Sequence, residues 1–176
     1  MNVREASLDD IQILAIHHRK MFEEIWQQKG LRIEIGRAKE LESAYIDKIT
    51  KQIPEGVCKA WVIRNDDEII ASGAITVVSY APIPSDLNHN IAFLHSMYTE
   101  KSHRQKKCAQ KIVERAIQYC QENGISRILL NTSDAGKPIY EKAGFVSSPE
   151  TMRLFIKQKK PLNKASAPDA KGRGFY

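Results

Sequence analysis

The sequence predicts an α/β (α+β) fold in which helices cover both faces of one mixed sheet. Two stretches carry this prediction. Residues 91–99 (IAFLHSMYT) are apolar almost throughout, as in a strand that is buried on both faces. Residues 108–121 (CAQKIVERAIQYCQ) repeat apolar side chains at spacings of three and four, as a helix with one buried face does. The elements expected around them give the order β-α-α-β-β-β-α-β-α-β-β, which favours such a layered sheet.

The first half of the chain is expected to begin with a short strand and two helices. Ser7 and the carboxylates after it resemble a capping box at a helix start. Gly30 ends the first helix, and Pro54 ends the second. Two apolar runs around an Asn-Asp-Asp turn then predict an antiparallel hairpin, with Gly73 marking a bulge or a close backbone approach. The expected bounds are a strand at 3–6, helices at 8–29 and 35–53, and strands at 58–64 and 68–78.

The second half is expected to continue with a long loop at residues 79–90, which is either a surface connection or part of a site. After the central strand and helix, a proline near its start and a glycine past its end define a short helix at 138–143. Further strands are expected at 126–131, 145–146 and 152–156. The polar, basic remainder is typical of a tail. The expected domains are therefore a folded unit at 1–156 and a basic C-terminal tail at 157–176.

The composition is that of a globular protein with enough apolar material for one core. The chain has 176 residues, of which 42% are hydrophobic and 27% are charged. No apolar run approaches the roughly 20 residues of a membrane span, and the first ten residues lack the apolar segment of a signal peptide. The three cysteines (Cys58, Cys108 and Cys120) form no metal-binding spacing. We therefore expect a cytoplasmic protein that has no metal site and does not bind a membrane.

Positive charge is concentrated in the second half of the chain. Residues 1–90 hold 11 basic and 14 acidic side chains, whereas residues 91–176 hold 16 basic and 7 acidic ones. Such a distribution suits a nucleic-acid binder, and it equally suits an enzyme with a polyanionic cofactor. Much of the excess lies at 101–107 and in the tail, with no nucleic-acid-binding motif beside it. We therefore expect no nucleic-acid partner.

The turn between the central strand and helix has the chemistry of a phosphate site. Residues 100–107 (EKSHRQKK) are dense in cations, and they directly precede a helix start. Unpaired N–H groups at a helix N-terminus favour a bound anion, and Arg104, Lys106 and Lys107 add full charges there. The alternative is a basic turn that is merely solvated.

Two motifs resemble those of the GNAT acyltransferase superfamily. Residues 104–109 (RQKKCA) resemble its Gln/Arg-x-x-Gly-x-Gly/Ala turn, which holds the pyrophosphate of coenzyme A. Residues 133–145 (SDAGKPIYEKAGF) resemble a segment of small GNAT proteins, and the similarity extends over about Val3 to Ile156. The resemblance implies a mostly antiparallel sheet of roughly six or seven strands. It also implies an acetyl-CoA-dependent N-acetyltransferase that acetylates a primary amine of a small molecule or an amino-acid-like acceptor directly, in a ternary complex.

Lys107 departs from this pattern, because the family has glycine at its position. Glycine there permits a positive φ or a close approach of phosphate. Two outcomes are open: the turn keeps its shape and Lys107 adds a charge, or the affinity for the cofactor is reduced. We expect the first.

The resemblance also implies which residues hold the cofactor. The pantetheine arm is expected along the end of the central strand, the diphosphate on the turn, and further contacts after the next strand. These residues are Met97, Tyr98, Thr99, Arg104, Gln105, Lys106, Lys107, Cys108, Ala109, Asn131, Ser133, Lys137 and Tyr140.

The catalytic assignments are Tyr140, His95 and Ser96. The resemblance gives Tyr140 the role of protonating the departing thiolate, although it could instead be a core tyrosine. The family's strand glutamate is missing, so His95 is the titratable candidate for the base, with a helix glutamate (Glu23 or Glu24) or water as alternatives. Ser96 would bond to the substrate or only to a neighbouring strand.

The acceptor is expected to enter over the first two helices and the loop at 79–90. Arg19 and Phe22 are the candidate acceptor-binding residues. The alternative function is a non-catalytic module that binds acyl-CoA or a protein partner, which the Lys107 replacement favours. A homodimer is compatible with the sequence.

Overall fold

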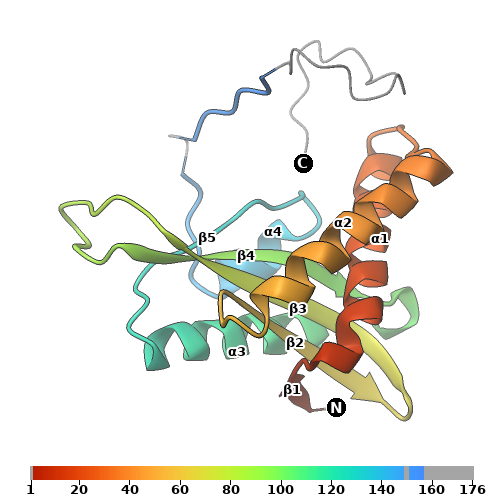
Figure 1. Cartoon of the computed structure of the whole chain (residues 1–176), viewed down its shortest axis with the longest axis horizontal. Coiled ribbons are helices and arrows are strands. Elements are labelled where there is room, and N and C mark those ends of the chain that lie inside the picture. Colours follow the sequence, from red (N-terminus) through yellow and green to blue (C-terminus); the bar gives the residue numbers. More distant parts are fainter. Residues whose placement is uncertain (1, 149–150, 157–176) are drawn as a thin grey trace.

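The computed structural model describes residues 2–148 and 151–156, so the predicted tail at 157–176 lies outside the described residues. One mixed sheet runs through the molecule (Figure 1). Neighbouring strands are antiparallel except the last pair, which is parallel. The predicted fold class is confirmed. The strands lie side by side in chain order: β1 (Val3–Glu5), β2 (Cys58–Asn65), β3 (Glu68–Ser79), β4 (Asn90–Thr99) and β5 (Ile128–Leu130).

Two helices cover one face of the sheet: α1 (Ile11–Gln28), which continues the short 3-10 helix η1 (Leu8–Asp10), and α2 (Ile35–Gln52). As predicted, the helix start is capped, because the backbone N–H of Ser7 donates to the Asp10 carboxylate at 2.8 Å. Burying a side chain such as that of Ile49 stabilises the fold by about 2–3 kcal/mol, which fixes these helices to the sheet. The core on this face contains Leu14, Ala15, Tyr45, Ile49, Cys58, Ala60, Val62 and Ala74.

The opposite face is covered by α3 (Cys108–Glu122), and the short helix α4 (Lys137–Lys142) packs against α3 (Figure 1). The apolar stripe of α3 faces the sheet, as its spacing predicts. In the described part of the chain, no helix has both the length and the apolar character needed to cross a membrane. The core on this face contains Trp61, Ile63, Ile75, Leu94, Ile112, Val113, Ala116 and Cys120.

A bulge interrupts the pairing of β3 with β4. Ser72 pairs with Tyr98 and Ala74 with His95, so that Gly73 faces two residues of β4. One of these, Ser96, has a positive φ of 56°. A Cβ at residue 73 would overlap the sulfur of Met97 on β4. Of the two alternatives predicted at Gly73, the bulge is present, with its extra residue in β4, and the atoms that approach Gly73 closely belong to side chains.

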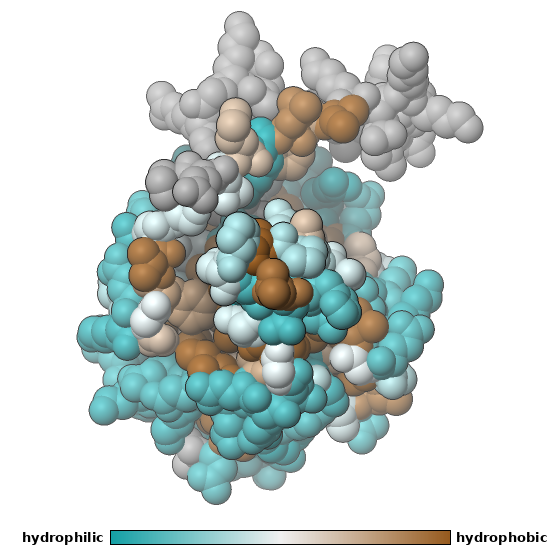
Figure 2. Space-filling view, turned by 90° about the vertical axis from the view of Figure 1, so that its left-hand side faces the viewer, coloured by the Kyte–Doolittle hydropathy of each residue, from teal (hydrophilic) through white to brown (hydrophobic). Residues whose placement is uncertain are grey.

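The β3–β4 connection projects from the body as a loop over residues 80–89 (Figure 1). Ile83 and Asp86 exchange backbone hydrogen bonds of 2.9 Å, and the Asp86 carboxylate lies 2.6 Å from the Arg127 guanidinium. Figure 2 looks onto this side of the molecule, where apolar and hydrophilic side chains are interspersed. Leu87 is 80% exposed. The loop is a surface connection, and none of its residues lines the cavity described below.

The two predicted closing strands do not form, so the sheet has five strands among the described residues instead of six or seven. Phe145 packs against the α3 core, but Val146 is exposed. The apolar side chains of residues 152–156 are at least 71% exposed, and the segment runs clear of the sheet (Figure 1). The alternating pattern favours extended backbone, but a strand also needs an edge beside it, and none lies there. The other elements form close to their predicted bounds.

Candidate functional site

A cavity of about 780 Å³ opens beside the C-terminal half of β4. β5 pairs with β4 only at Ala92, Phe93 and Leu94. From His95 onward, no other described strand lies along that side of β4. This open edge, α1, the N-terminal end of α3 and the segment 131–143 form the cavity walls. A ligand in the cavity can therefore reach the backbone of a strand.

The turn before α3 has the backbone expected of the cofactor-binding pattern. Lys107, the residue that precedes the first turn of α3, has φ 61° and ψ 17°. This left-handed conformation is the one that glycine adopts freely and that costs other residues about 1–2 kcal/mol. Gln105 also has a positive φ, of 63°. Lys107, Cys108 and Ala109 line the cavity. Whether Lys107 adds a charge contact to the cofactor or reduces its affinity stays a prediction.

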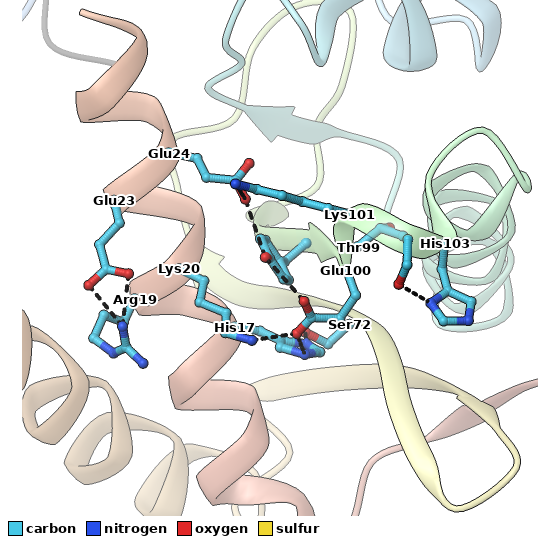
Figure 3. A network of polar contacts seen from close by, with 12 residues as sticks. His17, Arg19, Lys20, Glu23, Glu24, Ser72, Thr99, Glu100, Lys101 and His103 are labelled. Carbon is cyan, nitrogen blue, oxygen red and sulfur yellow. Dashed lines mark hydrogen bonds and ion pairs between the residues drawn. The ribbon is translucent and has the colours of Figure 1, made fainter. Parts of the chain in front are cut away.

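The side chain of Arg104 ties this turn to two other elements. Its Nη2 lies 2.6 Å from the Glu24 carboxylate of α1, and its Nε donates to the Thr99 carbonyl at 3.0 Å. The guanidinium also lies 5.8 Å from the centre of the Tyr98 ring. Glu24 further accepts a hydrogen bond from the Tyr98 hydroxyl at 3.3 Å and lies 3.9 Å from Lys101 (Figure 3). An ion-pair network thus surrounds the cationic turn.

A second polar group fixes α1 to the sheet behind the cavity. His17 Nδ1 lies 2.9 Å from the Ser72 hydroxyl, and His17 Nε2 lies 3.5 Å from the Glu100 carboxylate (Figure 3). Lys20 holds the same carboxylate at 2.6 Å. Burial lowers the pKa of His17 to about 4, so its ring is neutral at pH 7. His17 does not line the cavity and serves to attach the helix.

A continuous row of polar side chains begins at the β4 bulge. Ser96 Oγ lies 2.8 Å from His18 Nδ1 and 2.9 Å from His95 Nδ1. The other ring nitrogen of His95 lies 2.8 Å from the Thr76 hydroxyl. Lys48 Nζ donates to that hydroxyl at 2.9 Å. The row therefore connects α1, β4, β3 and α2.

Burial keeps both histidines of this row neutral. It is the main cause that lowers the pKa of His18 to about 4 and that of His95 to about 3, and the positive charge of Lys48 adds to both shifts. Both ring nitrogens of His95 have partners, so His95 has no free nitrogen to offer a substrate.

Tyr140 lies in the cavity wall on α4, opposite the open edge of β4. Its ring packs against Phe145 with centroids 5.8 Å apart. Burial raises the pKa of Tyr140 to about 12, which keeps the phenol protonated at neutral pH. Among the described residues, no hydrogen-bond partner holds its hydroxyl, so the group is available to a ligand.

The cavity gathers most of the residues predicted for the site, but three of them lie outside its walls. Arg19 is bound to Glu42 at 2.6 Å and to Glu23 at 2.8 Å, and Lys137 pairs with Glu141 at 3.7 Å. Lys106 is exposed on the turn. Predicted residues that do line the cavity are Phe22, His95, Ser96, Met97, Tyr98, Thr99, Arg104, Gln105, Lys107, Cys108, Ala109, Asn131, Ser133 and Tyr140.

His18 is not among the site residues predicted from the sequence, whereas the structure places it in the cavity wall beside Ser96. The available signal was a histidine among cavity-facing residues at helical spacing, with Met21, Phe22 and Ile25. Glu24, considered there as an alternative base, lies in the wall but is engaged by Arg104.

Comparisons with solved structures agree with this geometry. A protein from Clostridium acetobutylicum described as a predicted acetyltransferase, solved with acetyl-CoA, is 25% identical with a TM-score of 0.77 over 88% of this chain and 95% of its own. A GCN5-related N-acetyltransferase from Ralstonia eutropha JMP134 is 21% identical with a TM-score of 0.77 over 88% and 97%. Glucosamine-6-phosphate N-acetyltransferase from Arabidopsis thaliana is 18% identical with a TM-score of 0.59 over 89% and 98%. The last two show likeness of fold alone.

The sequence itself places the chain in a family. A search of curated proteins finds no match. The family model described as the acetyltransferase (GNAT) family matches residues 16–145, a span that includes most of α1, the cationic turn and Tyr140. Since this match covers most of the chain, the protein belongs to the GNAT family of acetyltransferases.

Proposed function

We propose that this protein transfers an acetyl group from acetyl-CoA to the primary amine of a small molecule or an amino-acid-like acceptor, with both substrates bound together. The observation that carries the proposal is the arrangement of one cavity. The turn before α3, the open edge of β4 and the Tyr140 phenol all lie in its walls. An anion site, a strand edge and a proton donor are the parts that direct acyl transfer from a coenzyme A thioester requires.

The residues present fit coenzyme A. The N-terminal end of α3, with Lys107 before it in a left-handed conformation, is suited to the diphosphate. The Thr99 hydroxyl is buried and has no hydrogen-bond partner among the described residues, so a polar ligand in the cavity would satisfy it. β5 pairs with β4 only as far as Leu94. Backbone groups on that edge of β4 beyond Leu94 are therefore available to the pantetheine arm as an added strand would use them.

Tyr140 is proposed as the acid. Acetyl-CoA supplies the acetyl group as an activated thioester. The Tyr140 hydroxyl holds its proton at neutral pH because burial raises its pKa to about 12, and it donates that proton to the thiolate sulfur that leaves. Asn131 and Ser133 lie in the same wall and would hold the arm of the coenzyme near this hydroxyl. Arg19 and Lys137 are left out of the proposed site because carboxylates hold both of them.

The acceptor is proposed to enter beside α1. His18, Met21, Phe22 and Ile25 share one face of that helix and line the cavity. The other α1 residues in this wall are Gln28 and Glu24, and Arg104 holds the Glu24 carboxylate, so little free charge is left to bind a highly charged acceptor. A small amine with an apolar portion is the acceptor that it favours.

The test is release of free thiol from acetyl-CoA with a panel of primary amines. We expect turnover with at least one amine, and a loss of about a hundredfold in kcat in Tyr140→Phe with little change in acetyl-CoA affinity. Tyr119→Phe is the matched control, because Tyr119 packs on Trp61 with centroids 5.8 Å apart and does not line the cavity. Thermal stabilisation by acetyl-CoA without turnover of any amine would instead favour a non-catalytic module.

A further inference from the structure

The row His18–Ser96–His95–Thr76–Lys48 connects the cavity to another part of the molecule. His18, Ser96 and His95 line the cavity, whereas Thr76 and Lys48 do not. Thr76 is buried and Lys48 is partly exposed on α2. Each gap between neighbouring polar atoms is between 2.8 and 2.9 Å. The row is thus an unbroken hydrogen-bonded path from the cavity toward the solvent side of α2.

This path crosses a layer that is otherwise apolar. The core between the sheet and the helices α1 and α2 consists mostly of alanine, leucine, isoleucine, valine and tyrosine side chains. Placing two imidazoles and two hydroxyls in such a layer costs free energy unless every group is paired. Apolar side chains of similar size would hold the helices to the sheet without that cost. All of these groups except His18 Nε2 are paired along the row, and this arrangement points to a function in proton movement.

The geometry singles out His18 as the end of the path that faces a substrate. His18 uses Nδ1 for Ser96, and its Nε2 has no hydrogen-bond partner among the described residues. The ring is fixed by stacking on Tyr45, with centroids 3.9 Å apart and planes at 7°, and by an edge contact with Phe22 at 5.0 Å. His95 differs, because both of its ring nitrogens are engaged.

We propose that His18 Nε2 takes the proton from the bound acceptor ammonium, and that Ser96 and His95 pass a proton on toward Thr76 and Lys48. This inference rests on the proposed acetyltransferase function. The N–H bond of the ammonium breaks, leaving the lone pair on the amine, and an H–Nε2 bond forms on His18. The Nδ1 proton of His18 moves to Ser96 as the serine proton moves to His95. The Nε2 proton of His95 then moves to Thr76, and the Thr76 proton moves to Lys48 Nζ as the Lys48 ammonium releases one of its own protons to solvent.

The charges around the path suit this role. The groups that face it are the Tyr45 phenol and Lys48 from α2, and the Cys58 thiol from β2 beside Lys48. Burial raises the pKa of Tyr45 and of Cys58, so both stay neutral, and burial lowers the pKa of Lys48. A neutral imidazole can accept a proton on one nitrogen and release one from the other, so neither histidine has to hold a charge for long.

The experiment compares two acceptors of the same shape. One is an aliphatic primary amine taken from the panel, and the other is its analogue with a trifluoromethyl group beside the amine carbon, which is already mostly neutral at pH 7. In His18→Gln we expect kcat/KM at pH 7 to fall about a hundredfold for the first amine and less than about threefold for the second. For the first amine, the difference in kcat/KM between His18→Gln and the unmodified protein should narrow as the pH rises toward the pKa of that amine. An equal loss with both amines at every pH would overturn the relay.

Three variants separate proton transfer from structure. Ser96→Ala and Lys48→Met interrupt the path while leaving His18 in place. In both variants kcat/KM is expected to fall more for the first amine than for the second, but by less than in His18→Gln. His17→Gln is the matched control on α1, because its ring faces Ser72 instead of the cavity. It is expected to change the stability of the fold and to leave the ratio of the kcat/KM values for the two amines unchanged. If His17→Gln changed this ratio of kcat/KM values as His18→Gln is expected to, the inference would be contradicted.

A measurement without turnover distinguishes a failure of this inference from a failure of the proposed function. Nitrogen chemical shifts of the histidine rings in the full-length protein are expected to show His18 neutral at pH 7, with its proton on Nδ1 and Nε2 bare. A charged His18 ring, or a proton fixed on Nε2, would overturn the relay whether or not the protein acetylates an amine. Failure of every amine in the panel, with these ring states found as expected, would instead count against the acetyltransferase proposal.

Discussion

The carboxylate of Glu24 lies 2.6 Å from the guanidinium of Arg104 and joins α1 to the turn that precedes α3. The pair brings an acidic group to the edge of the proposed diphosphate site. It also occupies the arginine that the sequence pattern assigns to the cofactor. Binding of a polyanion there has to compete with Glu24 or to accommodate it.

The first prediction follows from this pair. Glu24→Gln removes a negative charge beside the anion site and frees Arg104, so acetyl-CoA should bind about three- to tenfold more tightly, or up to ~1.4 kcal/mol. Titration calorimetry at low and moderate salt measures the effect, which should shrink as salt is added. Glu23→Gln is the control, because Glu23 pairs with Arg19 outside the cavity. Weaker binding in Glu24→Gln would show that the carboxylate positions Arg104 for the ligand.

The second prediction concerns the backbone of Lys107. Its φ of 61° is unfavourable for lysine and free for glycine, so Lys107→Gly should raise the free energy of unfolding by about 1 kcal/mol. The melting temperature should rise by roughly 2–4 °C, and the affinity for acetyl-CoA should stay within about tenfold. Lys106→Gly provides the comparison. Lys106 has no positive φ, so this variant should show no gain in the free energy of unfolding. A lower melting temperature for Lys107→Gly would contradict this account of the turn.

The third prediction concerns the contact at the bulge. Gly73→Ala would place a Cβ on the Met97 sulfur and 2.8 Å from a methyl carbon of Ile112, and should destabilise the protein by about 1–3 kcal/mol. The double variant Gly73→Ala with Met97→Ala should recover part of that loss, because it removes the overlapping atoms. Gly36→Ala is the matched control within α2, where a Cβ meets no atom within 4 Å. It should stabilise the helix by up to about 1 kcal/mol. Urea denaturation measures all three.

The fourth prediction is a dependence of stability on pH. Burial lowers the pKa of His17 and His18 to about 4 and that of His95 to about 3, whereas an unfolded histidine titrates near 6.5. As the pH falls below about 6.5, the unfolded chain binds protons first. The free energy of unfolding should therefore fall toward pH 4, by about 1.4 kcal/mol per pH unit for each histidine, and should not depend on these groups above about pH 7.

Urea unfolding at pH 7, 6 and 5 checks this dependence. His17→Gln removes one of the three histidines, so the slope of the free energy of unfolding against pH should fall by roughly a third. His89→Gln, at an exposed position in the β3–β4 loop, should leave it unchanged. A slope that stays the same in His17→Gln would mean that this ring is already charged in the folded protein.

The fold was predictable wherever one local pattern decides the element. The apolar run of β4 and the spacing of Ile112, Val113 and Ala116 on α3 each determine both the element and its buried face. The closing strands were not predictable in this way, since Met152 and Leu154 flank the polar Arg153 as in a strand but have no strand edge beside them. Local pattern favours a strand, and only the tertiary arrangement supplies its partner.

The site residues, too, were predictable only where they lie in a contiguous sequence motif. The turn around Lys107 and the segment containing Tyr140 are contiguous in sequence, so their motifs could be read directly. The contact of His18 with Ser96 joins residues far apart in sequence and depends on how α1 crosses the bulge, which no local pattern encodes. Arg19 was misplaced for a related reason: it lies about 100° around the helix from His18, and this turns it toward Glu42 on α2.

The three cysteines have a practical consequence for experiments on this protein. Cys58, Cys108 and Cys120 are 0%, 3% and 1% exposed, and none of them is paired. A disulfide reagent that detects thiol released from acetyl-CoA should therefore give a low background with the native protein. The slow labelling of these sulfurs would report how often the interior opens to solvent. One spectrophotometric trace can therefore follow both thiol release from acetyl-CoA and local opening of the core.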